Sequence, residues 1–458
     1  MFDSDRPRVL IAGGGVAALE GLLALRELVG DRASVEVIAP EDEFVYRQLA
    51  VAEPFSAGEA TRLPLGELVE DAGGVHRQAA VAEVRAAERV VVTDAGDELR
   101  YDALLIAIGA RPVEALPGAI TYRGFDSNAE IRRAVLDLDR GEIDSLGFAV
   151  PTSVRWALPI YELALLSAWH LGEMGDRDVE LHLITHELEP LGLFGEQGSG
   201  FLRELLAEAG IHLHTQAAPA RVEPGLVRLV GGGAIRSDRV IALPRLEVPP
   251  LAGVPQGPHG FIGTDREMRV EGTERIFAAG DVAWFPINQG GIAAQQADAA
   301  ARAIAACFEP EIETRPFAPV LRAALLTGEG PVYLRRGAGD GNGTSAAARS
   351  PLWWPPGKVA GRYLAPFLAA HANRTNQLPP PLEDLENPVG EIGERAGEEH
   401  DEAVRMCFVA ADGDARWGDY AGALRWLATA EQLAITLPAD YALKRDQWQR
   451  SAKETRVP

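Results

Sequence analysis

Short apolar runs alternate with helical stretches along most of the chain. Runs of strand length lie at residues 8–12, 34–38, 101–112, 146–150, 179–184, 211–214 and 276–283. Helical patterns cover residues 19–29, 128–140, 160–171, 199–210 and 290–306. This alternation is typical of parallel sheets with helices on both faces. It predicts an α/β protein with two doubly wound units, the second inserted in the first.

A glycine-rich turn, GGGVAA at residues 13–18, joins the first strand to the first helix. Gly13 suits a tight turn, Gly15 lets the backbone approach a pyrophosphate, and the small Ala18 lets helix and strand pack closely. A tight turn without a ligand is the alternative reading. The second strand should end in an acid that binds a ribose, but Ala39 stands there, and Glu41 is the candidate.

Two later segments make this pattern more specific. YDALLIAIGARP (101–112) and IFAAGDVA (276–283) are apolar strands that end in glycine, and small residues follow the second at 290–306. With the glycine turn they resemble the FAD-binding signature of the pyridine nucleotide-disulfide oxidoreductase superfamily. The resemblance implies two Rossmann-like FAD/NAD(P)-binding domains and an FAD-dependent oxidoreductase.

The resemblance also implies roles for single residues. Gly109 matches a glycine beside the adenine half of FAD, and Asp281 matches the ribityl-binding aspartate, with Gly280 allowing close approach. Gly291, Ile292 and Gln295 match a helix start that faces the flavin's pyrimidine side and stabilises negative charge there. The implied cofactor-binding residues are Gly13, Gly15, Ala18, Glu41, Arg47, Gly109, Gly280, Asp281, Gly291, Ile292 and Gln295.

The second unit lacks the glycine loop that relatives use for NAD(P)H. The turn after Val150 reads PTSVRWALP, so Cβ atoms and Trp156 occupy the approach of a pyrophosphate. NAD(P)H therefore remains a possible but doubtful donor, for which Arg155 offers only a charge. The following PIYE (159–162) resembles the helix start of sulfide:quinone oxidoreductases, whose chemistry needs two cysteines at the flavin. Trp156 stands at one such position, which disfavours a dithiol mechanism.

Two segments resemble the branch of sulfide:quinone oxidoreductases and type II NADH dehydrogenases: FVYRQLAVAEPF (44–55) and PLWWPPGKVAGRYLAPFL (351–368). Within them, Trp353, Trp354, Tyr363 and Phe367 suit either quinone stacking and peripheral membrane contact or a domain core. Tyr46, Trp156 and Glu162 are candidates for the flavin's surroundings. No residue is assigned as acid, base or nucleophile.

The expected organisation follows from these elements. We expect the FAD-binding domain at 1–125 and 251–330, the second domain at 126–250 and a further core segment at 331–377. Residues 378–402 are rich in Pro, Glu and Asp and predict a linker. The helical extension, at 403–411, 420–433 and 439–453, resembles one tetratricopeptide unit. A single unit must pack on the body, on a second subunit or on a protein partner.

Charge and composition narrow the function. A net charge of -23 argues against nucleic acid as a partner. No apolar run reaches the roughly 18 residues of a membrane span, and the first residues lack signal-peptide features, so we expect a cytoplasmic protein. The two cysteines, Cys307 and Cys407, lack CxxC spacing, and His182, His186, His212 and His214 lack a third metal ligand at readable spacing. We expect no metal site.

Two functions remain open. The first is an oxidoreductase that passes electrons from NAD(P)H or another small donor through FAD to a quinone or small acceptor, without catalytic cysteines. The second is an FAD-bound, catalytically quiet sensor or assembly protein that uses its C-terminal helices.

Overall fold

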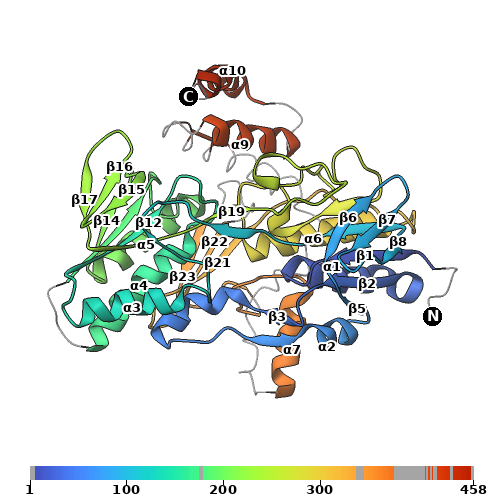
Figure 1. Ribbon diagram of the computed structural model, residues 1–458, viewed down its shortest axis with the longest axis horizontal. Coiled ribbons are helices and arrows are strands. Elements are labelled where there is room, and N and C mark those ends of the chain that lie inside the picture. Colours follow the sequence, from blue (N-terminus) through green and yellow to red (C-terminus); the bar gives the residue numbers. More distant parts are fainter. Residues whose placement is uncertain are drawn as a thin grey trace.

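The first sheet is parallel and carries the glycine motifs. The computed structural model describes residues 6–174, 179–336, 345–353, 355–375, 408, 411–412, 415, 420–433 and 437–454. Its first sheet has the strand order β20-β9-β1-β2-β5. These strands are β1 (Arg8–Ala12), β2 (Ser34–Ala39), β5 (Val75–Gln78), β9 (Ala103–Ile106) and β20 (Ile276–Ala278). Helices α1 (Val16–Val29) and α6 (Gly290–Ala306) lie side by side beside it (Figure 1).

The second sheet is also parallel and comes entirely from the chain between β9 and β20. Its order is β11-β18-β12-β13-β14. These strands are β11 (Ile120–Thr121), β12 (Ser145–Val150), β13 (Glu180–Thr185), β14 (Ile211–His214) and β18 (Arg239–Ala242). Helices α3 (Asn128–Asp139), α4 (Leu158–Met174) and α5 (Gly195–Glu208) connect them. The prediction of a second doubly wound unit inserted in the first is confirmed.

Small antiparallel sheets complete the body. They pair β3 (Glu43–Val45) with β4 (Arg62–Pro64) and β10 (Arg111–Val113) with β19 (Arg245–Glu247). Three-stranded sheets are formed by β6 (Val81–Arg85), β7 (Val90–Thr93) and β8 (Glu98–Arg100), by β15 (Pro219–Glu223), β16 (Leu226–Leu229) and β17 (Ala234–Arg236), and by β21 (Leu321–Leu326), β22 (Pro331–Arg336) and β23 (Ser345–Ala348). The remaining elements are α2 (Leu65–Asp71) and the 3-10 segments η1 (Gly30–Arg32), η2 (Arg47–Phe55), η3 (Gly192–Phe194), η4 (Pro258–Gly260) and η5 (Gly280–Val282).

Within the described part of the chain, three helices with defined bounds follow the last sheet. Helix α7 (Leu364–Thr375) descends from the body, whereas α9 (Tyr420–Leu433) and α10 (Ala439–Glu454) form a pair on the opposite side (Figure 1). Phe408 stacks on Tyr441 at 4.1 Å between ring centroids. The predicted helices at 420–433 and 439–453 are confirmed, while the linker at 378–402 and most of the helix at 403–411 lie outside the described residues.

The core elements match the apolar pattern closely. Strands β1 and β12 are almost wholly buried, as expected of parallel strands covered on both faces. Helix α1 begins at Val16, three residues before the expected start, because the glycine turn itself forms its N-terminus. The strands expected at 101–112 and 276–283 are shorter in the structure, where they correspond to β9 and β20. Both segments leave the sheet before their glycines, Gly109 and Gly280. The domain boundaries at 125/126, 250/251 and 330/331 stay predictions.

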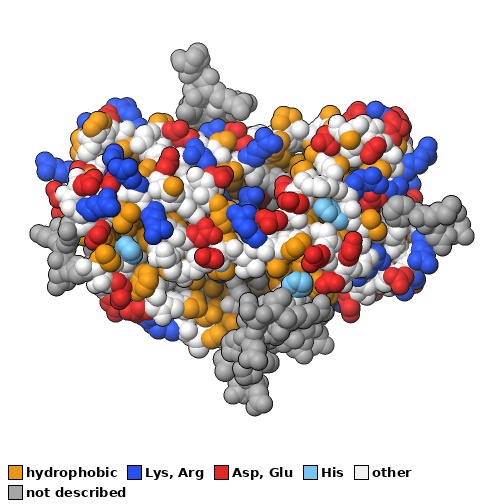
Figure 2. Space-filling view, turned by 60° about the horizontal axis from the view of Figure 1, so that its bottom comes forward, with side chains coloured by type: hydrophobic (Ala, Val, Ile, Leu, Met, Phe, Trp, Pro, Cys, Tyr) orange, Lys and Arg blue, Asp and Glu red, His pale blue; other side chains and the backbone are white. Residues whose placement is uncertain are grey.

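The surface shows no division by charge on the face in Figure 2, where acidic and basic side chains are interspersed. Among the helices of the described part of the chain, none has the length and hydropathy that crossing a bilayer requires.

Candidate active site

Three strand ends bring the glycine motifs together. In the first sheet Ile106 pairs with Ala12 on one side and with Ala278 on the other. Gly13, Gly109 and Gly280 follow these three residues at the carboxyl edge of the sheet. Open parallel sheets bind ligands at this edge. Segments separated by up to 267 positions, from Gly13 to Gly280, therefore share one site.

The first turn contains one glycine that the fold requires and one that faces open space. Gly13 has φ +118°, and a Cβ there would lie 2.2 Å from the carbonyl oxygen of Ala107. A Cβ on Gly15, the N-cap of α1, would meet nothing within 4 Å. Ala18 is fully buried, as close packing of the helix requires. The open N-terminus of α1 fits a pyrophosphate, since its backbone N–H groups and dipole favour an anion.

The other two glycines line the same edge. A Cβ on Gly109 would also meet nothing within 4 Å. Gly280 has φ +79° and donates its N–H to Gln296 Oε1 at 2.9 Å. This bond fixes the turn that presents Asp281.

Asp281 lies in a polar cluster that fits a hydroxyl-rich ligand. Burial raises the pKa of its carboxyl, and a hydrogen bond from Asn288 and the charges of Arg47 and Arg155 oppose that rise. Asn288 Nδ2 donates to Asp281 Oδ1 at 3.2 Å, while the buried Asn288 Oδ1 and Gln48 Oε1 have no hydrogen-bond partner in the protein. Such buried atoms normally need a partner. The cluster thus fits the ribityl chain of FAD.

The start of α6 closes one side of this region. Gln289 caps the helix by accepting from the N–H of Ile292 at 3.0 Å. Gly290 lies so close to Val359 and Gln48 that a Cβ would sit 2.7 Å from the valine. Gln295, expected at the flavin, instead binds Gly291 O and both backbone groups of Val320. Its amide therefore ties α6 to the chain entering β21.

Glu41 and Arg47 occupy exposed positions. Glu41 follows β2 and is solvent-exposed, and Arg47 begins η2. The buried acid on β2 is Glu36, which is held by Arg8 and Arg77 at 2.5 Å each. Glu36 is thus committed to an ion-pair network, and the assignment of Glu41 to the ribose stays a prediction.

The glycine-free turn of the second fold is filled by its own side chains. Arg155 Cζ lies 4.0 Å from the ring centroid of Phe261 and 3.9 Å from that of Trp284. Trp156 meets the edge of Phe194 at 6.0 Å. The expectation that Arg155 could meet a phosphate is not supported, because its guanidinium is stacked against the first fold.

An acid at the end of β13 is also committed within the protein. Glu187 Oε2 accepts from Tyr161 OH at 2.6 Å and from Thr185 Oγ1 at 2.9 Å. Burial raises the pKa of Glu187 to about 7, against the opposing effect of these hydrogen bonds. Acids at this position of a dinucleotide fold can bind ribose. Here the carboxyl accepts instead from Tyr161 of α4 and Thr185 of β13.

A buried ion pair joins α4 to the segment before α7. Lys358 Nζ lies 2.6 and 2.8 Å from the two carboxylate oxygens of Glu162, which is fully buried and also accepts from Leu326 N–H. Next to it, Tyr46 OH accepts from Val359 N–H at 2.9 Å, and burial raises the pKa of Tyr46 to about 12. Tyr46 and Glu162 were candidates from the sequence. Lys358 was missed, although it is one of three lysines in the chain.

Most of the aromatic segment is core. Trp353 is 1% exposed, donates to Gly357 O and packs edge-on against Tyr333. Tyr363 and Phe367 are partly buried against the main core. The core reading is confirmed for Trp353, while Trp354 lies outside the described residues.

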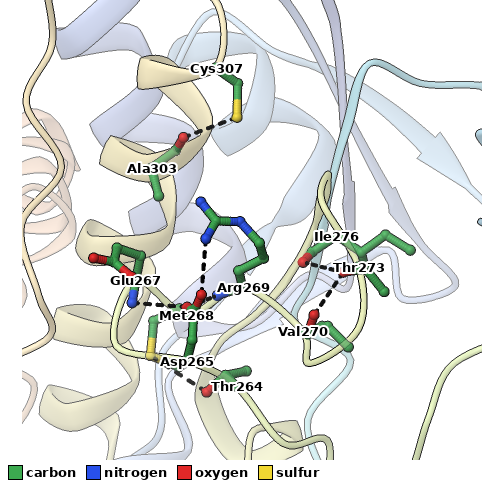
Figure 3. A network of polar contacts seen from close by, with 10 residues as sticks. All are labelled: Thr264, Asp265, Glu267, Met268, Arg269, Val270, Thr273, Ile276, Ala303 and Cys307. Carbon is green, nitrogen blue, oxygen red and sulfur yellow. Dashed lines mark hydrogen bonds and ion pairs between the residues drawn. The ribbon is translucent and has the colours of Figure 1, made fainter. Parts of the chain in front are cut away.

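Cys307 and the clustered histidines of β13 and β14 make their contacts within the protein. Cys307, at the end of α6, donates its thiol to Ala303 O one turn earlier at 3.3 Å (Figure 3). His182 lies 3.2 Å from His214 and stacks on His212. Within the described ranges no cluster of His, Cys, Asp or Glu could hold a metal ion. Cys407 lies outside those ranges.

Known proteins share this arrangement. The model of the pyridine nucleotide-disulphide oxidoreductase family matches residues 7–149 and 161–303, and the interruption coincides with the glycine-free turn. An NADH dehydrogenase-like protein of Mycobacterium tuberculosis is 27% identical over 293 residues, 60% of this chain and 72% of the relative. A demethylphylloquinone reductase of Synechocystis is 26% identical over 297 residues, with the same coverage of both chains.

A solved structure agrees in fold. The sulfide:quinone oxidoreductase of Aquifex aeolicus superposes with a TM-score of 0.67 at 18% identity, covering 84% of this chain and all of that one. The family match spans more than half of the sequence and includes every glycine motif of the site. The chain therefore belongs to the pyridine nucleotide-disulphide oxidoreductase family and is an FAD-dependent oxidoreductase.

Proposed function

We propose that this oxidoreductase takes electrons from NAD(P)H or another small donor and delivers them to a quinone or small acceptor, without a dithiol. The observation that carries the proposal is the convergence of Gly15, Gly109 and Asp281 at one sheet edge. The relatives named for NADH and for a demethylphylloquinone support the choice of donor and acceptor class.

In the proposed site each residue has a physical task. FAD, when bound, supplies the two-electron chemistry. The N–H groups at the start of α1 would hold its pyrophosphate, and Asp281, bonded to Asn288, would orient the ribityl hydroxyls. The N-terminus of α6, with Ile292, would lie on the flavin's pyrimidine side, where the helix dipole would favour negative charge.

Reduction of a quinone also needs protons at the acceptor. Lys358 and Glu162 are buried and bonded to each other, which holds the Lys358 ammonium in a fixed position next to the Tyr46 hydroxyl. Tyr46, whose hydroxyl accepts from Val359 N–H, keeps its own proton available for a carbonyl oxygen. We assign these three residues to the acceptor side.

The donor side departs from the family pattern. A dinucleotide finds no glycine in the turn 151–157, so its pyrophosphate must bind elsewhere along the second fold, and the donor's affinity is reduced. Peripheral membrane contact and assembly through α9 and α10 are further parts of the proposal.

Anaerobic stopped-flow absorbance tests the proposal. The yellow holoprotein is mixed with NADH, NADPH or sulfide while the flavin band near ~450 nm is followed, and a water-soluble quinone is then added. We expect bleaching by a nicotinamide and recovery with the quinone. Bleaching only by sulfide would exclude NAD(P)H and make sulfide the small donor.

A second function is favoured by one observation. Arg155 and Trp156 fill the turn that would receive a dinucleotide, as a catalytically quiet flavoprotein would allow. In that case no donor bleaches the bound FAD, and the protein acts as a sensor or assembly component through its C-terminal helices.

A further inference from the structure

Arg155 crosses from the second fold into the first. It belongs to the turn between β12 and α4, but both rings that contact its guanidinium come from the FAD-binding half of the chain. Its Nη1 also donates to Phe285 O at 3.2 Å. A planar cation held between two aromatic faces keeps a fixed position.

The two rings are themselves held rigidly. Phe261 and Trp284 meet edge to face at 5.5 Å. Ile262 N–H donates to Val282 O, and Trp284 N–H donates back to Ile262 O at 2.7 Å. The backbone that carries the rings therefore continues directly from Asp281.

The position of Arg155 has an electrostatic consequence for the site. Trp284 and Phe285 follow Asp281 by three and four residues, and the charge of Arg155 is felt at the Asp281 carboxyl. Asp281 is the residue assigned to the ribityl chain, which leads to the flavin ring. A positive charge fixed there favours any state of the cofactor that carries more negative charge.

We propose that Arg155 is a positioning residue whose fixed charge raises the reduction potential of the bound flavin. The inference rests on the proposed FAD site at Asp281. The proposal gives a role to this turn of the second fold, in which relatives carry a glycine loop for a dinucleotide. Here the turn instead places a cation against the first fold. Charge is the property that matters, so lysine should replace arginine better than any neutral residue.

The test measures the midpoint potential of bound FAD by stepwise dithionite reduction against a reference dye. Arg155→Gln keeps a planar group between the rings, and we expect its reduction equilibrium to fall at least tenfold, about 30 mV for two electrons. Arg155→Met should shift it similarly, and Arg155→Lys should stay near the wild type. Arg245→Gln, at a partly buried ion pair on β19, is the matched control and should not shift.

Each result either supports or overturns the role of the Arg155 charge. Equal potentials in wild type and Arg155→Gln, or equal shifts in the lysine and glutamine variants, would overturn the proposal. FAD retained by the lysine variant but lost from both neutral ones supports a role of the charge, whereas loss from all three, the charged lysine variant included, would overturn it. The potential requires neither donor nor acceptor, so failure of the proposed turnover leaves this measurement readable.

Discussion

Glu162 and Lys358 form a buried ion pair with Nζ–Oε distances of 2.6 and 2.8 Å, although 196 positions separate them in the chain. The pair connects α4 of the second fold to the segment that leads into α7. It lies beside Tyr46 and Val359, where we place the acceptor.

Removing one partner of this pair should be costly. Lys358→Met leaves an uncompensated carboxylate in the core, and we expect a loss of about 3–5 kcal/mol in the free energy of unfolding. The double variant Glu162→Leu/Lys358→Met should recover much of it. Urea denaturation of the holoprotein measures both. Arg85→Met, at the exposed pair with Glu98, is the control and should cost much less than Lys358→Met. If Lys358→Met lowers the free energy of unfolding no more than Arg85→Met does, the ion pair is not buried.

Glu187 should make stability depend on pH. Its folded-state pKa is raised from 4.5 to about 7, so the folded protein holds a proton that the unfolded chain releases. Stability contributed by this group is therefore complete below pH 4.5 and is lost as pH rises to 7, by about 3 kcal/mol. Glu187→Gln, which still accepts from Tyr161 OH, should remove this slope. Unfolding free energies between pH 5 and about 8 test it, and parallel profiles would show that Glu187 titrates normally.

Two glycines of the first turn should respond differently to substitution. Gly13→Ala places a Cβ against Ala107 O at a strained φ, so the apoprotein should lose about 1–3 kcal/mol. A Cβ on Gly15 would meet no protein atom within 4 Å, so for Gly15→Val we expect apoprotein stability to change by less than about 0.5 kcal/mol while FAD affinity falls at least tenfold. Chemical denaturation and the ratio of flavin to protein absorbance separate the effects. Gly172→Ala, equally open but on α4, should keep FAD. Full FAD retention by Gly15→Val would show that the pyrophosphate does not bind at this turn.

A cysteine-free chain should remain active. The sequence contains two cysteines, so Cys307→Ala/Cys407→Ala removes every thiol. If no dithiol takes part, the rate of flavin reduction and of reoxidation by quinone should stay within about twofold of the wild type, because the Cys307 thiol donates to Ala303 O of its own helix. Loss of reduction by sulfide alone would instead reveal thiol chemistry with that donor.

Much of the fold was predictable because its signals are local. Apolar runs of strand length, helix-length patterns and glycine turns located β1, β12, β14, α6 and α9 within a residue or two. The apolar pattern gave the wrong bounds where tertiary contacts decide the end of an element. The strand expected at 101–112, for example, ends at Ile106, where the chain leaves the sheet. Arg155 shows the limit for the site, since its sequence neighbours gave no indication of Phe261 or Trp284.

The sequence by itself determined the two doubly wound units, the FAD motifs and the missing second glycine loop, because each depends on residues adjacent in the chain. Only the tertiary structure decided that Lys358 meets Glu162, that Gln295 binds Val320, and that Arg155 of the second fold packs against Trp284 of the first. Such contacts depend on how separate elements pack. Burial then gives them their chemical effect, because a charge removed from water must find its partner wherever the fold provides one.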